Sequence, residues 1–489
     1  MSDPTFGLSI TRVDNESRPA VGSDMAVVGL VGTAPDADVT MFPVDTPVLI
    51  FSDDAVALTK LGLTGTLPDA VQAVNDQLGE FEVAARIVIV RVADNANPDT
   101  VITSLVGSQA SKTGIWALVE AGPVLGVIPR LIGVPGYTWQ QKQGILSASV
   151  SAQGSGGTNG TFPLGFTGGT GSGALGTFTV AGGKLTSVQI NGGGAYSVAP
   201  TLSFAASAGL TGASANLSLG LTANPVVAAL PPVLDRLLGH AVVSGPHTNL
   251  TDFTNWRETI QSGRIIPLET AVKNLAGVVQ DGAPRVLGIG VRRDHENGGR
   301  PFHSWANQPV QGIIGANRPI GFSLTDGATE GQTILSQNGG VILRGEAGVE
   351  SAIASGGFVY VGTDTCSEDP LWQFYNVSRG RDYIHLLFLR TLRFYLGRFN
   401  LNGQTIEAVL STMKLALRDL QADGDILGFK VGFSRDQNSP EQLRLGKFTV
   451  DFAAEEAPVL RYLGLRSARY RPALDTLLND LLAQIDTTA

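Results

Sequence analysis

The residues that could do chemistry in this chain are scattered, and one short motif is the first to test. Residues 171–176 read GSGALG and match G-x-G-x-x-G, the pattern of dinucleotide-binding loops. That loop needs its glycines between a strand and a helix, with an acidic residue about 20 positions further on. No Asp or Glu follows nearby, and the neighbouring residues favour short strands. We interpret the match as belonging to a glycine-rich β region. The chain has neither a G-x-x-x-x-G-K-[ST] phosphate loop nor a G-x-S-x-G nucleophile elbow.

Histidine and cysteine chemistry is equally sparse. Asp294-His295-Glu296 lies in a polar stretch, Arg292–Arg300, that we expect to be a solvated loop. Cys366 follows a short strand with no base beside it, so we expect a buried small hydrophobe. The sequence predicts no catalytic residue, no metal site and no cofactor. The five histidines show no pair at the spacing of metal ligands: His240, His247, His295, His303 and His385, the last predicted to be a packing residue of an apolar helix.

Composition narrows the class of protein further. The formal net charge of −9 argues against general nucleic-acid binding, which depends on neutralising phosphates with Lys and Arg. The charge is uneven, because residues 379–489 carry 15 Lys and Arg against 13 Asp and Glu, while the rest is acidic. A single cysteine excludes an internal disulfide framework. No signal peptide and no apolar run of about 18 residues is present, so we expect synthesis in a reducing cytoplasm and no membrane insertion.

Any functional residues would be positioned by strands and helices, and the patterns of both alternate along the chain. Short apolar runs alternate with helical patterns, which predicts an α/β layer with a largely parallel sheet. Expected strands are Met25–Val31, Pro47–Phe51, Ala84–Val92, Leu131–Val134, His240–Val243 and Arg264–Pro267. Expected helices are Asp53–Leu61, Pro68–Leu78, Val226–Leu238 and Asp252–Ser262.

A glycine-rich segment interrupts this rhythm. Between Ser151 and Thr222 the only charged residue is Lys184. Strand and turn signals keep a regular spacing there, which favours a compact β insertion at a surface loop over a disordered linker, although the linker stays open as an alternative. The expected strands are Gly176–Val180, Lys184–Ile190 and Pro200–Phe204.

The last quarter of the chain predicts a small α+β domain. Two segments alternate apolar and polar residues, as half-buried strands do. Ile426–Phe433 turns Phe429, Val431 and Phe433 inward, and Lys447–Phe452 turns Phe448, Val450 and Phe452 inward. Ser434–Gly446 is the expected loop between them. The expected helices are Arg379–Arg398, Thr405–Leu420 and Pro472–Ile485.

Two extended segments could complete this sheet. Two strands alone are marginal in water, and their outer edges are templates for further strands. Thr5–Thr11 and Ala457–Tyr470 are strand-forming tails at the two ends of the chain. We therefore expect assembly by strand exchange between copies. The arm residues expected to participate are Phe6, Leu8 and Ile10 at one end and Val459, Leu460, Tyr462 and Leu463 at the other.

Several motifs resemble the sheath proteins of contractile phage tails. They are FPVDTPVLIFS (Phe42–Ser52), PRLIGVPG (Pro129–Gly136), GTDTCSEDPLWQFYNVSR (Gly362–Arg379) and LRLGKFTVDFAAEEAPVLRYLGLR (Leu443–Arg466). They occur in the family's order and cover nearly the whole chain except residues 141–222. One departure concerns Asp364-Thr365, where the family usually carries Arg–Thr, which puts any salt bridge of that arginine in doubt.

The resemblance implies a multi-domain subunit with a subtilisin-like α/β core. Along the chain it would comprise an N-terminal arm and linker (1–22), a first core segment (23–140), the β insertion (141–222), a second core segment (223–365) and a C-terminal α+β domain with exchanged arms (366–489). The expected partners are further copies in stacked hexameric rings, the tail tube, the baseplate and the tail terminator. The expected location is the virion.

The resemblance also implies a mechanism, in which a metastable extended sheath contracts and drives the tube through the host envelope. The helix Arg379–Arg398 is a candidate for gripping an acidic tube, with Arg381, Arg390, Arg393 and Arg398 facing it. A solvated or internally paired helix, or a contact through Pro472–Ile485, stays open. The sheath of a tail-like bacteriocin or gene-transfer particle is the alternative within the class. A subtilisin-like hydrolase is disfavoured because no His-Gly and no Gly-Thr-Ser segment is present.

Overall fold

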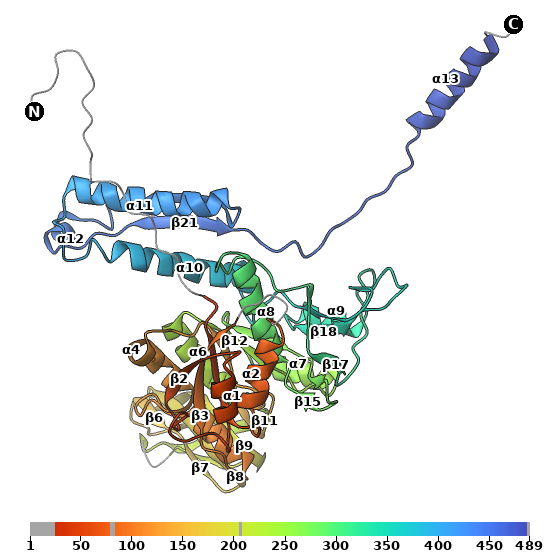
Figure 1. Ribbon diagram of the computed structural model, residues 1–489. Helices are drawn as coiled ribbons and strands as arrows, with labels where there is room; N and C mark the ends of the chain where they lie inside the picture. The colour runs from red at the N-terminus through yellow and green to blue at the C-terminus, as the bar shows by residue number, and fades with distance from the viewer. Residues whose placement is uncertain (1–24, 79–83, 205–207, 487–489) are drawn as a thin grey trace, which may run out of the picture. The chain divides into compact units, whose positions relative to one another are not determined.

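The structure is a computed structural model that describes residues 25–78, 84–204 and 208–486 (Figure 1). The chain up to Ala457 forms one compact unit, and Pro458–Ala489 forms another. The larger unit contains an α/β core, a β insertion and a helix–hairpin region. The arm residues Phe6, Leu8 and Ile10, and their linker, lie outside the described residues.

A six-stranded sheet forms the centre of the core. Its order is β13-β12-β4-β1-β3-β2, and every neighbouring pair is parallel except β2–β3. The prediction of a largely parallel sheet is therefore confirmed. The inner strands are continuous apolar runs because helices cover both faces. The strands are β1 (Val28–Thr33), β2 (Pro47–Phe51), β3 (Arg86–Val92), β4 (Leu131–Gly133), β12 (His240–Ser244) and β13 (Ile265–Leu268).

The two faces of the sheet are covered by different sets of helices. One face packs against α1 (Ala55–Leu61), α2 (Leu67–Asn75) and α8 (Ala283–Glu296). The other packs against α3 (Pro98–Val106), the 3-10 helix η2 (Gly114–Glu120), α4 (Ala121–Leu125), α6 (Pro225–Leu237), α7 (Leu250–Glu258) and α9 (Glu330–Ser336). Two small antiparallel sheets complete the core. They are β14 (Val272–Asn274) with β15 (Val279–Gln280) and β17 (Ile313–Ala316), and β19 (Phe358–Val361) between β16 (Gln308–Pro309) and β18 (Val341–Arg344).

Helix α8 corrects the prediction of an irregular loop at Arg292–Arg300, because the helix runs to Glu296. Two glycines obscure its apolar face in the sequence. A side chain on Gly288 would meet Val74 of α2 and Gln77, which follows that helix, and one on Gly290 would meet the Trp305 ring. Glycine at these positions lets α8 pack closely against its neighbours, at the cost of the usual helical pattern.

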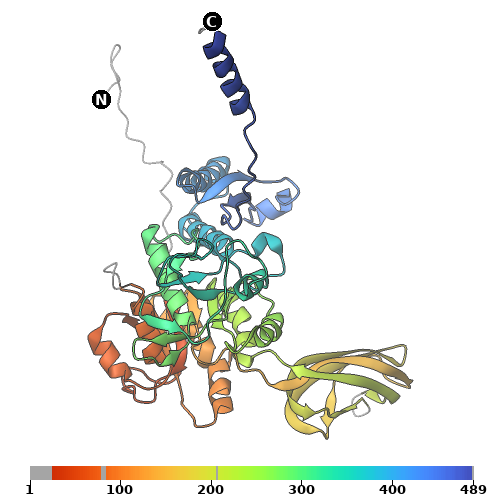
Figure 2. The same ribbon diagram turned by 90° about the vertical axis from the view of Figure 1, so that its right-hand side faces the viewer.

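The insertion is an ordered β body with its own small core, as predicted, and not a linker (Figure 2). It lies between β4 and α6, and its first and last strands pair with each other from Gln143 opposite Leu221. Gly182 and Gly183 both have positive φ, as the tight turn between β8 and β9 requires. The strands are β5 (Gln143–Ser155), β6 (Gly160–Pro163), β7 (Gly165–Thr167), β8 (Thr170–Ala181), β9 (Lys184–Val198), β10 (Thr201–Ser203) and β11 (Thr211–Leu221).

After β19, the 3-10 helix η3 (Pro370–Trp372) leads into two long helices and a hairpin (Figure 1). The helices are α10 (Tyr375–Leu392) and α11 (Gly403–Ala422), so α10 ends before the predicted Arg398. Strand β20 (Ile426–Gly432) agrees with the prediction. Its partner β21 (Asp451–Glu456) begins four residues later than expected, and the connector contains a short helix, α12 (Pro440–Arg444).

The smaller unit contains an extended segment and one helix. Residues 457–470 form no helix or strand, and α13 (Pro472–Asp486) follows with proline in its first turn, close to the prediction.

Candidate assembly surface

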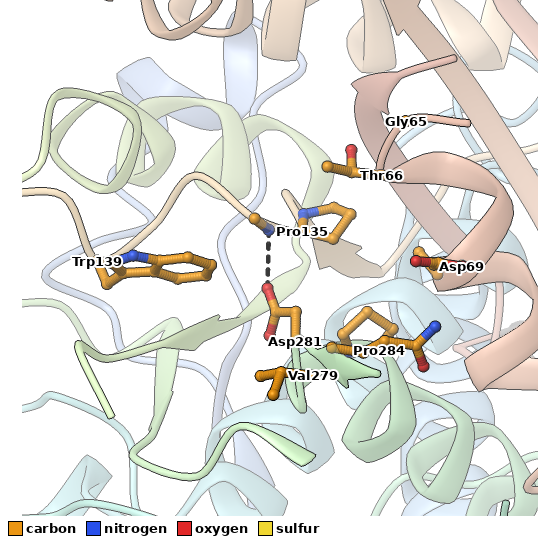
Figure 3. A pocket seen from close by; sticks show the side chains of 11 residues that line it. Gly65, Thr66, Asp69, Pro135, Trp139, Val279, Asp281 and Pro284 are labelled. Carbon is orange, nitrogen blue, oxygen red and sulfur yellow. Dashed lines mark hydrogen bonds between the residues drawn. The ribbon is translucent and has the colours of Figure 1, made fainter. Parts of the chain in front are cut away.

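A crevice beside the core sheet is the place to look for enzyme chemistry. It lies beyond the carboxyl ends of β1 and β4, where the strand order reverses and α/β folds usually bind ligands. Its volume is about 190 Å3. Figure 3 shows the side chains that line it. The Asp281 carboxylate in it accepts hydrogen bonds from Gly136 N and Ala283 N, both at 2.9 Å, and from the Ser244 hydroxyl. These hydrogen bonds give Asp281 a structural role, because they connect separate segments around the crevice.

Cys366 is buried, as predicted, whereas His385, predicted to be a packing residue, is exposed. Burial raises the pKa of Cys366 to about 12, so its thiol stays protonated and unreactive. His240 is buried and its Nε2 lies 2.9 Å from the Ser378 hydroxyl; burial lowers its pKa well below the usual value. The His385 ring contacts Phe452 edge-on. Among the described residues, no group of three or more His, Cys, Asp and Glu could hold a metal ion. No helix described in the structure is long and apolar enough to cross a membrane.

A buried ion pair joins α10 to the core. The Arg379 guanidinium donates to both carboxylate oxygens of Asp294 on α8, at 3.0 and 2.5 Å, and to the main-chain oxygen of Met25 at 3.3 Å. It also lies 4.9 Å from the centre of the Trp305 ring. Asp294 is therefore a buried partner of Arg379, which corrects its expected place in a solvated loop. No local pattern in the sequence indicates the pair, because 85 positions separate the two residues.

Two more contacts describe the same junction. Arg264, which immediately precedes β13, donates to both oxygens of Asp382 on α10, at 2.5 and 3.1 Å. Asp364 is buried and accepts hydrogen bonds from Thr363 Oγ1 at 2.7 Å and Gln373 Nε2 at 3.1 Å. These contacts hold α10 firmly on the core.

The hairpin beyond this junction is an incomplete sheet. β20 and β21 form a two-stranded sheet, and its inner face packs on α10 and α11. Before β21, the side chain of Asn438 accepts from Thr449 N at 2.8 Å and donates to Thr449 O at 2.9 Å, as a neighbouring strand would. Strand alternation then directs the main-chain groups of Phe448, Val450 and Phe452 to the opposite edge. No described strand lies along that edge.

An apolar groove accompanies this free edge. It measures about 360 Å3 and is formed by α10 and Phe452. Leu389 is 61% exposed and Leu396 is 78% exposed, although both are large aliphatic side chains. Neither residue is among the predicted interface residues. Leu389 lies on α10, whereas Leu396 lies in the turns beyond its end at Leu392, so no helical spacing relates them in the sequence.

The predicted interface residues fall into three groups. Phe429, Val431, Val450 and Phe452 are half-buried and packed against the helices, while the Phe448 ring contacts Phe433, which is exposed. In the smaller unit, Val459 is half-buried and Leu460, Tyr462 and Leu463 are exposed. The N-terminal residues Phe6, Leu8 and Ile10 lie outside the described residues.

Known proteins with similar sequences are tail sheath proteins of phages. No protein-family model matches the chain. It is 25% identical over 476 residues to the tail sheath protein of Escherichia phage P2, covering 95% of this chain and 96% of that protein. It is also 39% identical to the major tail sheath protein of Serratia phage KSP20 over 148 residues, which are 29% of this chain and 36% of that protein.

A solved structure extends the comparison to the fold. The chain matches the contracted helical sheath of the anti-feeding prophage with a TM-score of 0.57 and 12% identity, over 96% of this chain and 100% of that one. The chain is therefore similar to sheath proteins in both sequence and fold over almost its full length. The chain belongs to the contractile tail sheath family. It is a structural sheath subunit and not an enzyme.

The sheath subunit's candidate tube-facing arginines have different surroundings. Arg381 makes an ion pair with Glu456, with nitrogen–oxygen distances of 2.6 and 2.9 Å, donates to Ala454 O and lies over Trp372. Arg381 is therefore paired within its own domain, which is the alternative stated for this helix. We do not include it among the arginines proposed to face the tube. Arg390 and Arg393 are exposed, and so is Arg398, which lies 5.2 Å from the centre of the Phe394 ring.

Proposed function

We propose that this sheath subunit polymerises as stacked hexameric rings around a tail tube and contracts to drive the tube through the host envelope. The observation that carries the proposal is the two-stranded sheet β20–β21 with a free edge, in a chain that also has an extended arm. An arm from a neighbouring copy would add a strand along Phe448–Phe452. β-Augmentation suits a polymer of this kind because main-chain hydrogen bonds provide the affinity.

The groove below that edge supports an apolar arm. A strand beside β21 would point alternate side chains toward Leu389 and Leu392. Phe6, Leu8 and Ile10 have this alternation, and so does a portion of 459–463. The finer architecture belongs to the proposal: a subtilisin-like core, a C-terminal domain with exchanged arms, and segments bounded at residues 22, 140, 222 and 365.

Contraction would release energy without a nucleotide. If the contracted state buries more apolar surface between subunits, about 25 cal/mol per Å2 gives a few kcal/mol per subunit from modest added contact. Each ring multiplies that gain. The partners we propose are the tube, the baseplate and the tail terminator, and the location is a virion tail. The alternative is the sheath of a phage-derived injection particle, which the fold match to the anti-feeding prophage sheath favours.

Negative-stain electron microscopy of the purified chain tests assembly. We compare the full chain with a variant lacking Met1–Ala20, and confirm by circular dichroism that both are folded. Hollow tubes that form only with the arm present support strand exchange. A full-length chain that stays monomeric at high concentration would contradict the proposal.

The tube contact has its own test. We propose that Arg390 and Arg398 face the acidic outside of the tube, together with Arg393. Arg390→Glu with Arg398→Glu should leave contracted polymers intact but prevent extended assembly on tubes. Arg435→Glu, at an exposed arginine of the hairpin connector, is the control. Normal extended tails from the double variant would remove α10 as the tube contact.

A further inference from the structure

The C-terminal helix α13 has an apolar stripe that no other described residue of its own unit covers. Its leucines recur at intervals of three and four, which places them on one face of the helix. All five are at least 45% exposed. The rest of the unit that the structure describes is an extended chain. A lone helix of this length gains most of its stability by packing that stripe against another surface. The stripe consists of Leu474, Leu477, Leu478, Leu481 and Leu482.

A second groove of the larger unit offers a surface of the right kind. It measures about 610 Å3 and lies between the end of α10, the start of α11 and the chain entering β21. Leu396, Phe399 and Leu401 are exposed at its mouth, and Ile406, Val409 and Met413 line α11's side. The volume of the groove would admit several leucine side chains, and its walls are mostly apolar.

The charges of the two surfaces are opposite. Helix α13 carries Asp475, Asp480 and Asp486 and no Lys or Arg. Lys447 lines the groove, so an acidic side chain of α13 would meet a cation beside the apolar contact.

The chain between hairpin and helix gives α13 a long reach. Residues 457–471 are extended, and fifteen extended residues span at most about 50 Å. We propose that α13 of one sheath subunit docks its leucine stripe into the groove between α10 and α11 of a second copy. This inference rests on the proposed polymer. It assigns the second groove to a helix, while the free edge of β21 receives a strand.

Cross-linking between two variants tests the docking. One chain carries Leu396→Cys, the other Leu478→Cys, and the two are mixed, assembled and treated with a short bis-maleimide. The native Cys366 is buried and does not compete. The control replaces Leu478→Cys with Thr476→Cys, on the opposite face of α13. We expect a covalent dimer from the Leu478→Cys mixture and much less from the control.

Other outcomes separate the two proposals. Tubes that form without the cross-link overturn the docking of α13 and leave the polymer standing, with the tail tube as the helix's remaining partner. A chain carrying both cysteines that cross-links only within itself shows docking inside one copy and also overturns the proposal. If no tubes form with unmodified protein, the proposed polymer itself fails. A second cross-linking pair uses Leu396→Cys in one chain and Leu474→Cys in the other. Adding Leu478→Asp and Leu481→Asp to the Leu474→Cys chain should abolish the cross-link of this pair.

Discussion

The core sheet and the hairpin sheet differ in how fully their strands are paired and covered. In the core, β1 is buried along its whole length, has a parallel strand on each side and is covered by helices on both faces. In the hairpin, β21 has one partner strand and half-exposed inner side chains. The core therefore supplies the stability of the single subunit. The hairpin keeps an edge along which no described strand lies, and this edge is a template for a further strand.

The first prediction tests the free edge of the hairpin by blocking it. Val450→Pro removes one main-chain N–H that strand alternation directs outward, so the subunit should fold normally but fail to form tubes. Electron microscopy and circular dichroism measure the two properties. Thr449→Pro is the matched control, because it removes the N–H held by Asn438 and should disturb the hairpin itself. Tubes formed by Val450→Pro would show that this edge takes no strand.

The second prediction tests the closed side, at the junction of α10 and α8. Asp294→Ala leaves the Arg379 guanidinium buried without its anion and should cost about 3–5 kcal/mol of unfolding free energy. Urea denaturation measures it. The double variant Asp294→Leu with Arg379→Met removes both charges and should recover most of the loss. Equal destabilisation in both variants would show that packing, and not the uncompensated charge, sets the cost.

The third prediction concerns pH. Burial raises the pKa of Glu269 to about 7, against the opposing effect of its ion pair with Arg318. The folded state thus holds this proton more tightly than the unfolded state. The contribution of Glu269 to stability is greatest at acidic pH and is lost as pH rises toward and through 7. Thermal unfolding between pH 5 and 8 should show this slope, and Glu269→Gln should flatten it. An unchanged slope in the variant would assign the pH dependence to other groups.

The smallest effect is expected from the insertion. Its first and last strands pair at their roots, so residues 143–221 can be replaced by a short Gly-Ser linker. We propose that the insertion lies on the outside of the sheath, and the shortened chain should then fold and still form tubes. Loss of folding would show that the core depends on the insertion. A cut at Ser151 would be a poorer test because it divides β5.

The sequence predicted elements whose side-chain pattern reflects burial directly. β1 and β3 were found because continuous apolar runs are typical of strands covered on both faces. α8 was missed because Gly288 and Gly290 replace apolar residues where neighbouring elements pack close. Lys447–Val450 alternates like a strand and is in fact held like one, but its partner is the amide of Asn438, so the strand begins only at Asp451.

The candidate site was predictable in outline only. Alternation identified Phe429, Val431 and Phe452 because their inward faces are local properties of a strand. The partners of Arg379 and Arg381 depend on tertiary contacts across 85 and 75 positions, for which the sequence carries no pattern. The grooves depend on where helices end. α10 stops at Leu392, and the turns that follow carry Leu396 and Phe399 to the mouth of the larger groove.

The hydrogen bond from Arg379 to the main-chain oxygen of Met25 has a mechanical consequence. Met25 is where the described chain begins, three residues before β1. A pull on the segment before Met25 would reach the guanidinium before it reached the sheet, and the ion pair with Asp294 would divide that load between α8 and α10. A neighbouring copy that tugged on this end of the chain would then move both regions of the subunit as one body, without peeling β1 from the sheet.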